Sequence, residues 1–198
     1  MRNTSYYIIN GITFYRVFAS AILLTLILTR QVEIFKWVLG FSFFTDAIDG
    51  FLARKYKVVS KLGSRLDSIG DDLTVLMGVI GIFVFKPGFM QQHAVIVFIV
   101  IMLTLLVIQM TLALYRYKRL SSFHTYLAKI AALFQGGFLI LIFFLPEWPM
   151  PLFYAAAIIT ILDLVEEIIL VLMIPVWRTD VKGWYWVRRV SKKRSRVA

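Results

Sequence analysis

Long apolar segments dominate the chain, and short polar stretches separate them. Six segments have the length and hydropathy of helices that cross a bilayer, which takes about 20 apolar residues each. They are 12–28, 35–53, 66–85, 94–115, 126–145 and 152–176. Two of the connections contain prolines that end helices, Pro87 and Pro146. The pattern predicts an all-α integral membrane protein of six transmembrane helices, with residues 1–198 forming one domain.

Composition supports this fold class and limits the chemistry. The 198 residues are 60% hydrophobic and 17% charged, which excludes an ordinary soluble domain. The chain has no cysteine and two histidines, so a metal site would need oxygen ligands, which suit Mg²⁺, Mn²⁺ or Ca²⁺. The N-terminal segment is too polar for the apolar region of a signal peptide, so we expect it in the mature protein.

The basic residues are distributed unevenly along this pattern. All but three of the 22 Lys and Arg lie near the termini, in the 54–65 loop, in the 116–129 region or in the tail. The exceptions are Arg30, Lys36 and Lys86. Because basic residues favour the cytoplasmic side, we expect both termini and the 54–65 loop in the cytoplasm.

The C-terminal tail, about 177–198, combines Trp184, Tyr185 and Trp186 with a run of basic residues. It is either a solvated tail that helps to set topology or an interfacial segment held on anionic lipid. Neither interpretation needs a nucleic acid, so the net charge of +11 does not indicate one.

Five of the seven aspartates fall within residues 43–72, where each carboxylate at membrane depth costs a few kcal/mol. On helices they form two stripes. The first has Asp46, Asp49, Gly50 and Ala53 at positions 0, 3, 4 and 7, and the second has Gly63, Asp67 and Asp71 at 0, 4 and 8. A short basic loop joins the two helices, so we expect them to be antiparallel, with four carboxylates facing one another near the cytoplasmic surface.

Such a carboxylate cluster needs a counter-charge, which one or two divalent cations would supply. The small residues Gly50, Ala53 and Gly63 leave room for a ligand or for close helix packing. Arg54, at the membrane edge, has the geometry to bind a diphosphate. The pattern therefore favours a metal–diphosphate site over an acidic, ion-paired helix end without chemistry.

Together the residues run Asp46-x2-Asp49-Gly50-x2-Ala53-Arg54-x8-Gly63-x3-Asp67-x3-Asp71. This run resembles the complete signature of the CDP-alcohol phosphotransferases, which are integral membrane enzymes of phospholipid synthesis. The resemblance implies that an acceptor hydroxyl attacks the lipid-side phosphorus of CDP-diacylglycerol and that CMP leaves. It also implies an active site at the cytoplasmic face of the cell (inner) membrane and a tendency to form homodimers.

The same resemblance implies a role for each signature residue. The metal ligands would be Asp46, Asp49, Asp67 and Asp71, holding two ions of Mg²⁺ or Mn²⁺. Asp71 would also be the general base for the acceptor hydroxyl. Gly50, Ala53 and Gly63 would line the cytidine site, and Arg54 would contact the diphosphate.

The acceptor alcohol is predicted from other residues. An anionic acceptor needs cations, and the candidates are Arg116, Lys118, Arg119 and Lys129, although charges at the end of a span also set topology. Lys129 lies on an apolar helix, where an ammonium should meet an anion. We expect glycerol 3-phosphate as acceptor. Serine is one alternative, since the run LDSIGD is closer to the serine-accepting members of the family. Inositol and inositol phosphate are further alternatives.

Three acids on the last segment lie outside the signature. Asp163, Glu166 and Glu167 are spaced 0, 3 and 4, and should pair with a base such as Lys129 or Arg16, or bind a cationic acceptor amine. They are also the feature that favours a rival, a divalent-cation transporter. A membrane prenyltransferase is a further rival. These enzymes have more than six helices, however, and their paired aspartate motifs are spaced differently.

Overall fold

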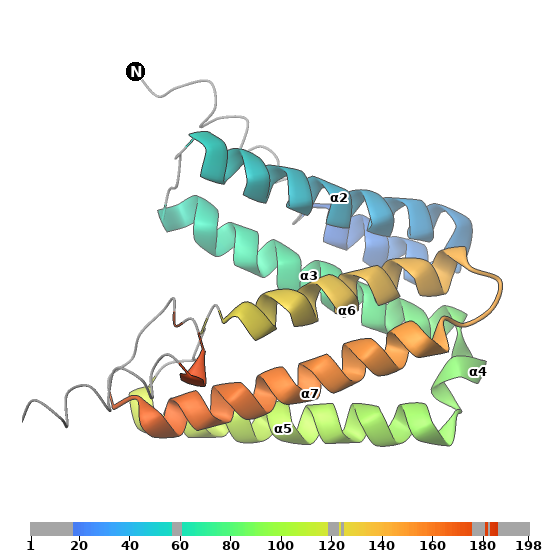
Figure 1. Cartoon of the computed structure of the whole chain (residues 1–198). Helices are drawn as coiled ribbons and strands as arrows, with labels where there is room; N and C mark the ends of the chain where they lie inside the picture. Colours follow the sequence, from blue (N-terminus) through green and yellow to red (C-terminus); the bar gives the residue numbers. More distant parts are fainter. Residues whose placement is uncertain are drawn as a thin grey trace, which may run out of the picture. The chain divides into compact units, whose positions relative to one another are not determined.

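The computed structural model describes residues 18–56, 61–118, 123, 125–175, 181 and 183–185. Within helices, the side chains of 46, 47, 49–56, 61–69, 71 and 72 are not described. The described residues contain helices and no strand. In chain order the helices are Phe18–Leu28, α2 Val32–Tyr56, α3 Lys61–Phe85, α4 Pro87–Met90, α5 His93–Tyr117, α6 Tyr126–Phe144 and α7 Met150–Met173 (Figure 1).

The six predicted segments each correspond to one helix, of which Phe18–Leu28 is short within the described residues. Residues 12–17 of the first segment lie outside the described residues. The short helix α4 was not predicted; it forms because Pro87, in the first turn, has a backbone already fixed near helical geometry. Among the described residues, two helices, α5 and α6, are long and apolar enough to cross a membrane, judged by length and composition alone. Helix α7 is of similar length but carries three carboxylates.

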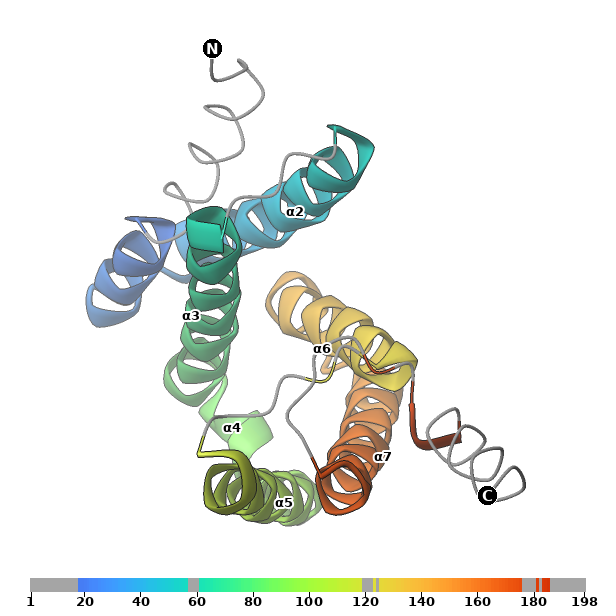
Figure 2. The same cartoon turned by 90° about the vertical axis from the view of Figure 1, so that its left-hand side faces the viewer.

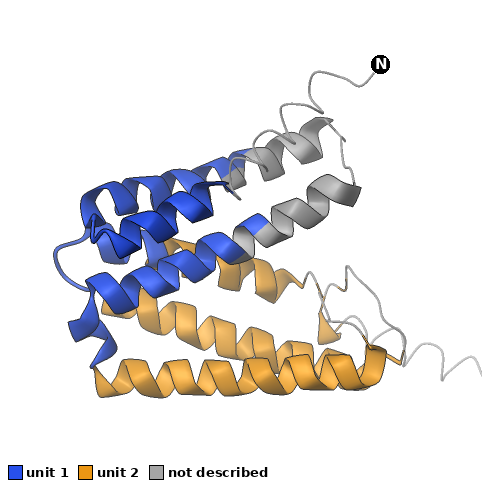
Figure 3. Ribbon diagram, turned by 180° about the vertical axis from the view of Figure 1, so that it is seen from behind, with its two compact units in different colours: residues 1–91, 139–148 blue, residues 92–138, 149–198 orange. Residues whose placement is uncertain are grey.

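The chain divides into two compact units (Figure 3). Unit 1 comprises residues 1–91 and 139–148, and unit 2 comprises residues 92–138 and 149–198. The division passes through α6, between Phe138 and Leu139.

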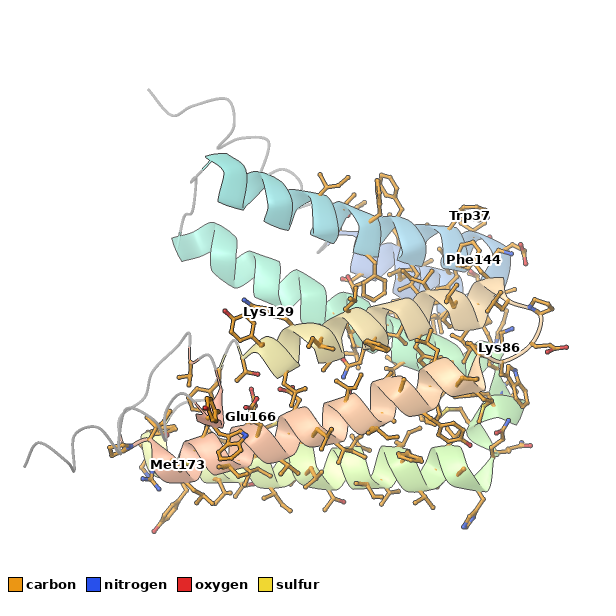
Figure 4. All side chains as sticks on the ribbon, in the orientation of Figure 1. Trp37, Lys86, Lys129, Phe144, Glu166 and Met173 are labelled. Atoms are coloured by element: carbon orange, nitrogen blue, oxygen red, sulfur yellow. The ribbon has the colours of Figure 1, made fainter. Side chains whose placement is uncertain are left out.

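An aromatic cluster joins three helices of unit 1. Phe35 of α2 is fully buried, and its ring centroid lies 5.2 Å from that of Phe85 of α3 and 5.1 Å from that of Phe143 of α6. Gly81 of α3 makes this approach possible, because a Cβ there would lie 2.5 Å from Cζ of Phe35. Beside the cluster, Trp37 meets Phe144 edge to face at 5.0 Å (Figure 4).

Helices α5 and α7 form the main helix pair of unit 2, side by side in Figures 1 and 2. Contacts join Phe98 to Tyr154, Gln109 to Glu167 and Tyr117 to Ile174. The sequence offset is nearly the same for each contact, so the two helices are parallel and keep one register over most of their length. Their carboxyl ends are joined by the Tyr117 hydroxyl, which donates to the carbonyls of Val171 and Ile174 at 3.2 and 2.6 Å.

Gly81→Ala should destabilise the protein, since the new methyl group would overlap the Phe35 ring and lie 3.2 Å from the Phe143 ring. Overpacking of this kind costs about 1–3 kcal/mol. The matched control is Gly137→Ala, because a Cβ there meets nothing within 4 Å and alanine gains up to about 1 kcal/mol in helix propensity. The midpoint of thermal unfolding in detergent should fall for Gly81→Ala alone; equal midpoints for the two variants would contradict the packing described.

Candidate functional site

The signature residues lie on the two consecutive helices α2 and α3. The first helix carries Asp46, Asp49, Gly50, Ala53 and Arg54, and the second carries Gly63, Asp67 and Asp71. The prediction that both segments are helical is confirmed. At 3.6 residues per turn, each set falls on one stripe of its helix, except Arg54, which lies one residue beyond the first stripe. The side chains of all eight residues lie outside those that the structure describes.

The aromatic cluster of unit 1 fixes the register of this helix pair, which runs antiparallel (Figure 1). Phe35 of α2 packs against Gly81 of α3. Asp46 lies eleven residues after Phe35, and Asp71 lies ten residues before Gly81. At about 1.5 Å per residue, both are about 15 Å along the pair from the aromatic contact. The backbone therefore brings Asp46 and Asp71 to one level of the helix pair.

The residue types of the signature aspartates indicate which metal ion they could bind. Four aspartates supply oxygen ligands alone, and these suit a hard cation such as Mg²⁺ or Mn²⁺. Elsewhere, among the side chains that are described, no group of three His, Cys, Asp or Glu is placed to hold a metal ion. The residue types of the two stripes suit such an ion.

The predicted acceptor cations lie in unit 2. Arg116 is exposed in the last turn of α5, and Arg119 lies outside the described residues. Lys129 is exposed near the start of α6, with its ammonium 5.6 Å from the ring centroid of Tyr126 (Figure 4). This cation–π contact leaves the ammonium accessible, so Arg116 and Lys129 are both available to an anion.

The three acids of α7 each accept a hydrogen bond from a neutral donor. Glu167 accepts from Nε2 of Gln109 at 2.7 Å, and Asp163 accepts from the Thr125 hydroxyl at 3.4 Å. Glu166 accepts from the backbone N–H of Trp184 at 3.1 Å. From the sequence, the expected partners are a base such as Lys129 or Arg16, or a cationic acceptor amine. Lys129 makes its described contact with Tyr126, and Arg16 lies outside the described residues.

Sequence reasoning missed these neutral donors, although signals for two of them were present. Gln109 is buried and is the one amide within the apolar run of α5. Thr125 directly precedes α6, and its hydroxyl also accepts the N–H of Ala128 at 2.9 Å, as an N-cap residue does. A polar side chain in an apolar run and a capping threonine both point to a local polar partner.

A further hydrogen bond to α7 involves Thr160, which precedes the three acids on that helix. Nε2 of Gln135 donates to the Thr160 hydroxyl at 2.6 Å, and that hydroxyl donates to the carbonyl of Ala156 at 2.8 Å. Thr160, Asp163 and Glu167 are spaced three and four residues apart, so they share one face of α7. This face packs through hydrogen bonds rather than through ion pairs, as far as the described side chains show.

Comparison with known proteins decides the family. The sequence model of the CDP-alcohol phosphatidyltransferases matches residues 6–180. The chain belongs to the CDP-alcohol phosphatidyltransferase family. The resemblance carried by the signature is thereby confirmed, and the match extends across both units.

One curated relative is a CDP-diacylglycerol--inositol 3-phosphatidyltransferase from Saccharomyces cerevisiae (strain ATCC 204508 / S288c). It is 39% identical over 66 residues, which are 33% of this chain and 30% of the relative. The matched part is thus less than a third of the relative's length. No solved structure matches the chain.

Proposed function

We propose that this protein is a metal-dependent phosphatidyltransferase, which moves the phosphatidyl group of CDP-diacylglycerol to an alcohol acceptor and releases CMP. One observation carries the proposal: all eight signature residues lie on the helical backbone of α2 and α3, at matched levels, within the family match. In this reaction a bond forms between the acceptor oxygen and the lipid-side phosphorus, and the bond from that phosphorus to CMP breaks.

Each signature residue has a part in that step. Asp46, Asp49, Asp67 and Asp71 would hold two Mg²⁺ or Mn²⁺ ions, which neutralise charge on the diphosphate when bound. Asp71 would take the proton of the acceptor hydroxyl, as the resemblance to the family signature implies. Arg54 would bind the diphosphate through its guanidinium.

The small residues of the signature complete the donor site. Gly50 and Ala53 of α2 and Gly63 of α3 would leave space for the cytidine between the two helices. Larger side chains at these three positions would fill the volume that a base and a ribose require.

Membrane topology is part of the same proposal. All six predicted segments would cross the bilayer, with the termini and the α2–α3 connection in the cytoplasm, where water-soluble acceptors and CMP are available. The distribution of Lys and Arg supports this orientation. Most charges of α2 and α3 are those of the proposed site and of the cytoplasmic connection; Glu33 and Lys36 lie at the other end of α2, and Asp72 adjoins the signature.

For the acceptor we favour a phosphorylated polyol. The name of the yeast relative gives inositol as its acceptor, and the exposed cations Arg116 and Lys129 suit a phosphate. Inositol phosphate satisfies both observations, and glycerol 3-phosphate satisfies the second. Arg119 is a further candidate for the same phosphate by its place in the sequence.

The transporter alternative loses its main support in unit 2. It depended on the acids of α7 being available to a moving cation. Each of them accepts a hydrogen bond from a neighbouring segment, and the bond between Gln109 and Glu167 joins α5 to α7. The prenyltransferase alternative does not account for the family match.

Purified protein in detergent with CDP-diacylglycerol and an acceptor should release CMP only when Mg²⁺ or Mn²⁺ is present, and chelation by EDTA should abolish release. Asp71→Asn should lower kcat by about 10²–10⁴-fold, since it removes both a general base and a charged ligand. The control is Asp72→Asn, which removes a neighbouring carboxylate outside the signature and should retain activity. Full activity of Asp71→Asn would contradict the assignment.

A cysteine-free chain allows a direct test of topology. In intact cells, Glu147→Cys, in the exposed connection between α6 and α7, should react with a membrane-impermeant maleimide. Ser191→Cys in the tail should react only after the membrane is permeabilised. Labelling of both sites from outside would show that the proposed number of spans or the orientation is wrong.

Lys129→Gln should raise the KM for a phosphorylated acceptor about ten- to a hundredfold, because a charge-assisted contact is worth about 1.5–3 kcal/mol and 1.4 kcal/mol is tenfold. The KM for unphosphorylated inositol should not change. Lys86→Gln, which removes a lysine in unit 1, is the control and should leave both KM values unchanged. Turnover of free inositol alone, with no effect of Lys129→Gln, would establish a neutral acceptor instead.

A further inference from the structure

The chain turns back on α7 after that helix ends at Met173. Further along the chain, the described residues Val181, Gly183, Trp184 and Tyr185 form a segment that we call the C-terminal strap. The backbone N–H of Trp184 donates to Oε1 of Glu166 at 3.1 Å. Glu166 lies seven residues before the end of α7, which is about 10 Å back along the helix. The strap therefore lies alongside the last two turns of α7.

Two more features hold the strap in place. Val181 is buried in a cluster with Ala113 of α5 and with Leu170, Val171 and Ile174 at the end of α7. Gly183 is buried and has φ 144°, a conformation that a side chain would strain. The strap thus packs across the carboxyl ends of both helices by burial, by a charge-assisted hydrogen bond and by a position that requires glycine.

The strap presents its aromatic residues outward. Trp184 is 40% exposed and Tyr185 is 56% exposed. The hydroxyl of Tyr117 joins the end of α5 to the end of α7. At this end of α5, Tyr115 is 81% exposed, and the Lys118 ammonium lies 5.9 Å from the centroid of the Tyr115 ring. Exposed Trp and Tyr next to a cation, at the end of apolar helices, are typical of the headgroup level of a membrane.

The chain that follows the strap carries charge of one sign, although Asp180 directly precedes Val181. The 13 residues that follow Tyr185 contain six Lys or Arg and no acid, and Lys118 adds a cation at the same end of unit 2. Charge complementarity therefore specifies the partner. We propose that the C-terminal strap, with Tyr115 and Lys118, is a binding surface for the headgroups of anionic phospholipids, and that the bond to Glu166 fixes this surface at headgroup level.

The test uses tryptophan quenching in the full-length protein, reconstituted in phosphatidylcholine vesicles that contain a minor fraction of phosphatidylglycerol. Bromine atoms are placed on the acyl chains of either the anionic or the zwitterionic lipid, at equal fractions. The emission of Trp184 is the difference between wild type and Trp184→Phe. Brominated phosphatidylglycerol should quench it more strongly, and Lys118→Gln should reduce this preference by up to about fivefold, the effect of one cation near an anionic surface.

The controls separate the surface from other causes. Lys86→Gln should leave the preference unchanged. Glu166→Ala removes the acceptor of the Trp184 N–H and should weaken the preference, whereas Glu166→Gln keeps an acceptor oxygen and should retain most of it. Because Glu166→Ala can also impair folding, its unfolding midpoint is measured. If that midpoint is lower than that of the wild type, the test rests on Lys118→Gln instead.

Three results would overturn the proposal. Equal quenching by both brominated lipids would show that the strap does not select charge. An absence of quenching by either lipid would place Trp184 away from the bilayer. Loss of the preference in inorganic phosphate, but not in chloride of equal ionic strength, would identify a site for a free anion. None of these readouts uses the transferase activity, so the outcome is independent of the proposed function.

Discussion

A carboxylate on an apolar helix must have a partner, and this constraint governs both units of the protein. An uncompensated charge at membrane depth costs several kcal/mol, which is a large fraction of the stability of a small domain. In unit 2 the structure shows how the cost is offset, since an amide, a hydroxyl and a backbone N–H each donate to one acid of α7. In unit 1 the four signature aspartates lie on two helices at matched levels, and we propose that divalent cations offset their charge.

The two solutions have different consequences for function. A hydrogen bond from Gln109 or Thr125 orients a carboxylate and joins two segments, but it leaves the charge in place and occupies a lone pair. Such a bond is well suited to fixing the parallel register of α5 and α7. A metal ion cancels charge and can be exchanged, so carboxylates held for a cation remain open to a ligand. This difference is why we assign chemistry to the stripes of unit 1 and a structural role to the acids of unit 2.

Much of this arrangement is predictable from sequence, because periodicity and spacing are local properties. Each of the six apolar segments predicts a helix that the structure contains, and the spacing of the signature places Asp46 and Asp49 on one stripe and Asp67 and Asp71 on another. The neutral hydrogen-bond donors of the α7 acids were not predicted. The spacing left three partners open, namely Lys129, Arg16 or a cationic acceptor amine. In the structure neutral donors reach the acids, Lys129 lies over the ring of Tyr126, and Arg16 lies outside the described residues. Which donor reaches an acid depends on tertiary register, and a hydropathy pattern does not contain it.

Register is also what links packing in unit 1 to the proposed site. Phe35 approaches α3 closely only because Gly81 has no side chain, so the position of one glycine sets how α2 and α3 align. Asp46 and Asp71 lie eleven and ten residues from that contact, and a slip by one helical turn would separate them by about 5 Å along the pair. Two carboxylates share a cation through bonds of about 2.0–2.6 Å, so a slip of that size would prevent joint ligation. The aromatic cluster, remote from the aspartates, is therefore a condition for the metal site that we propose.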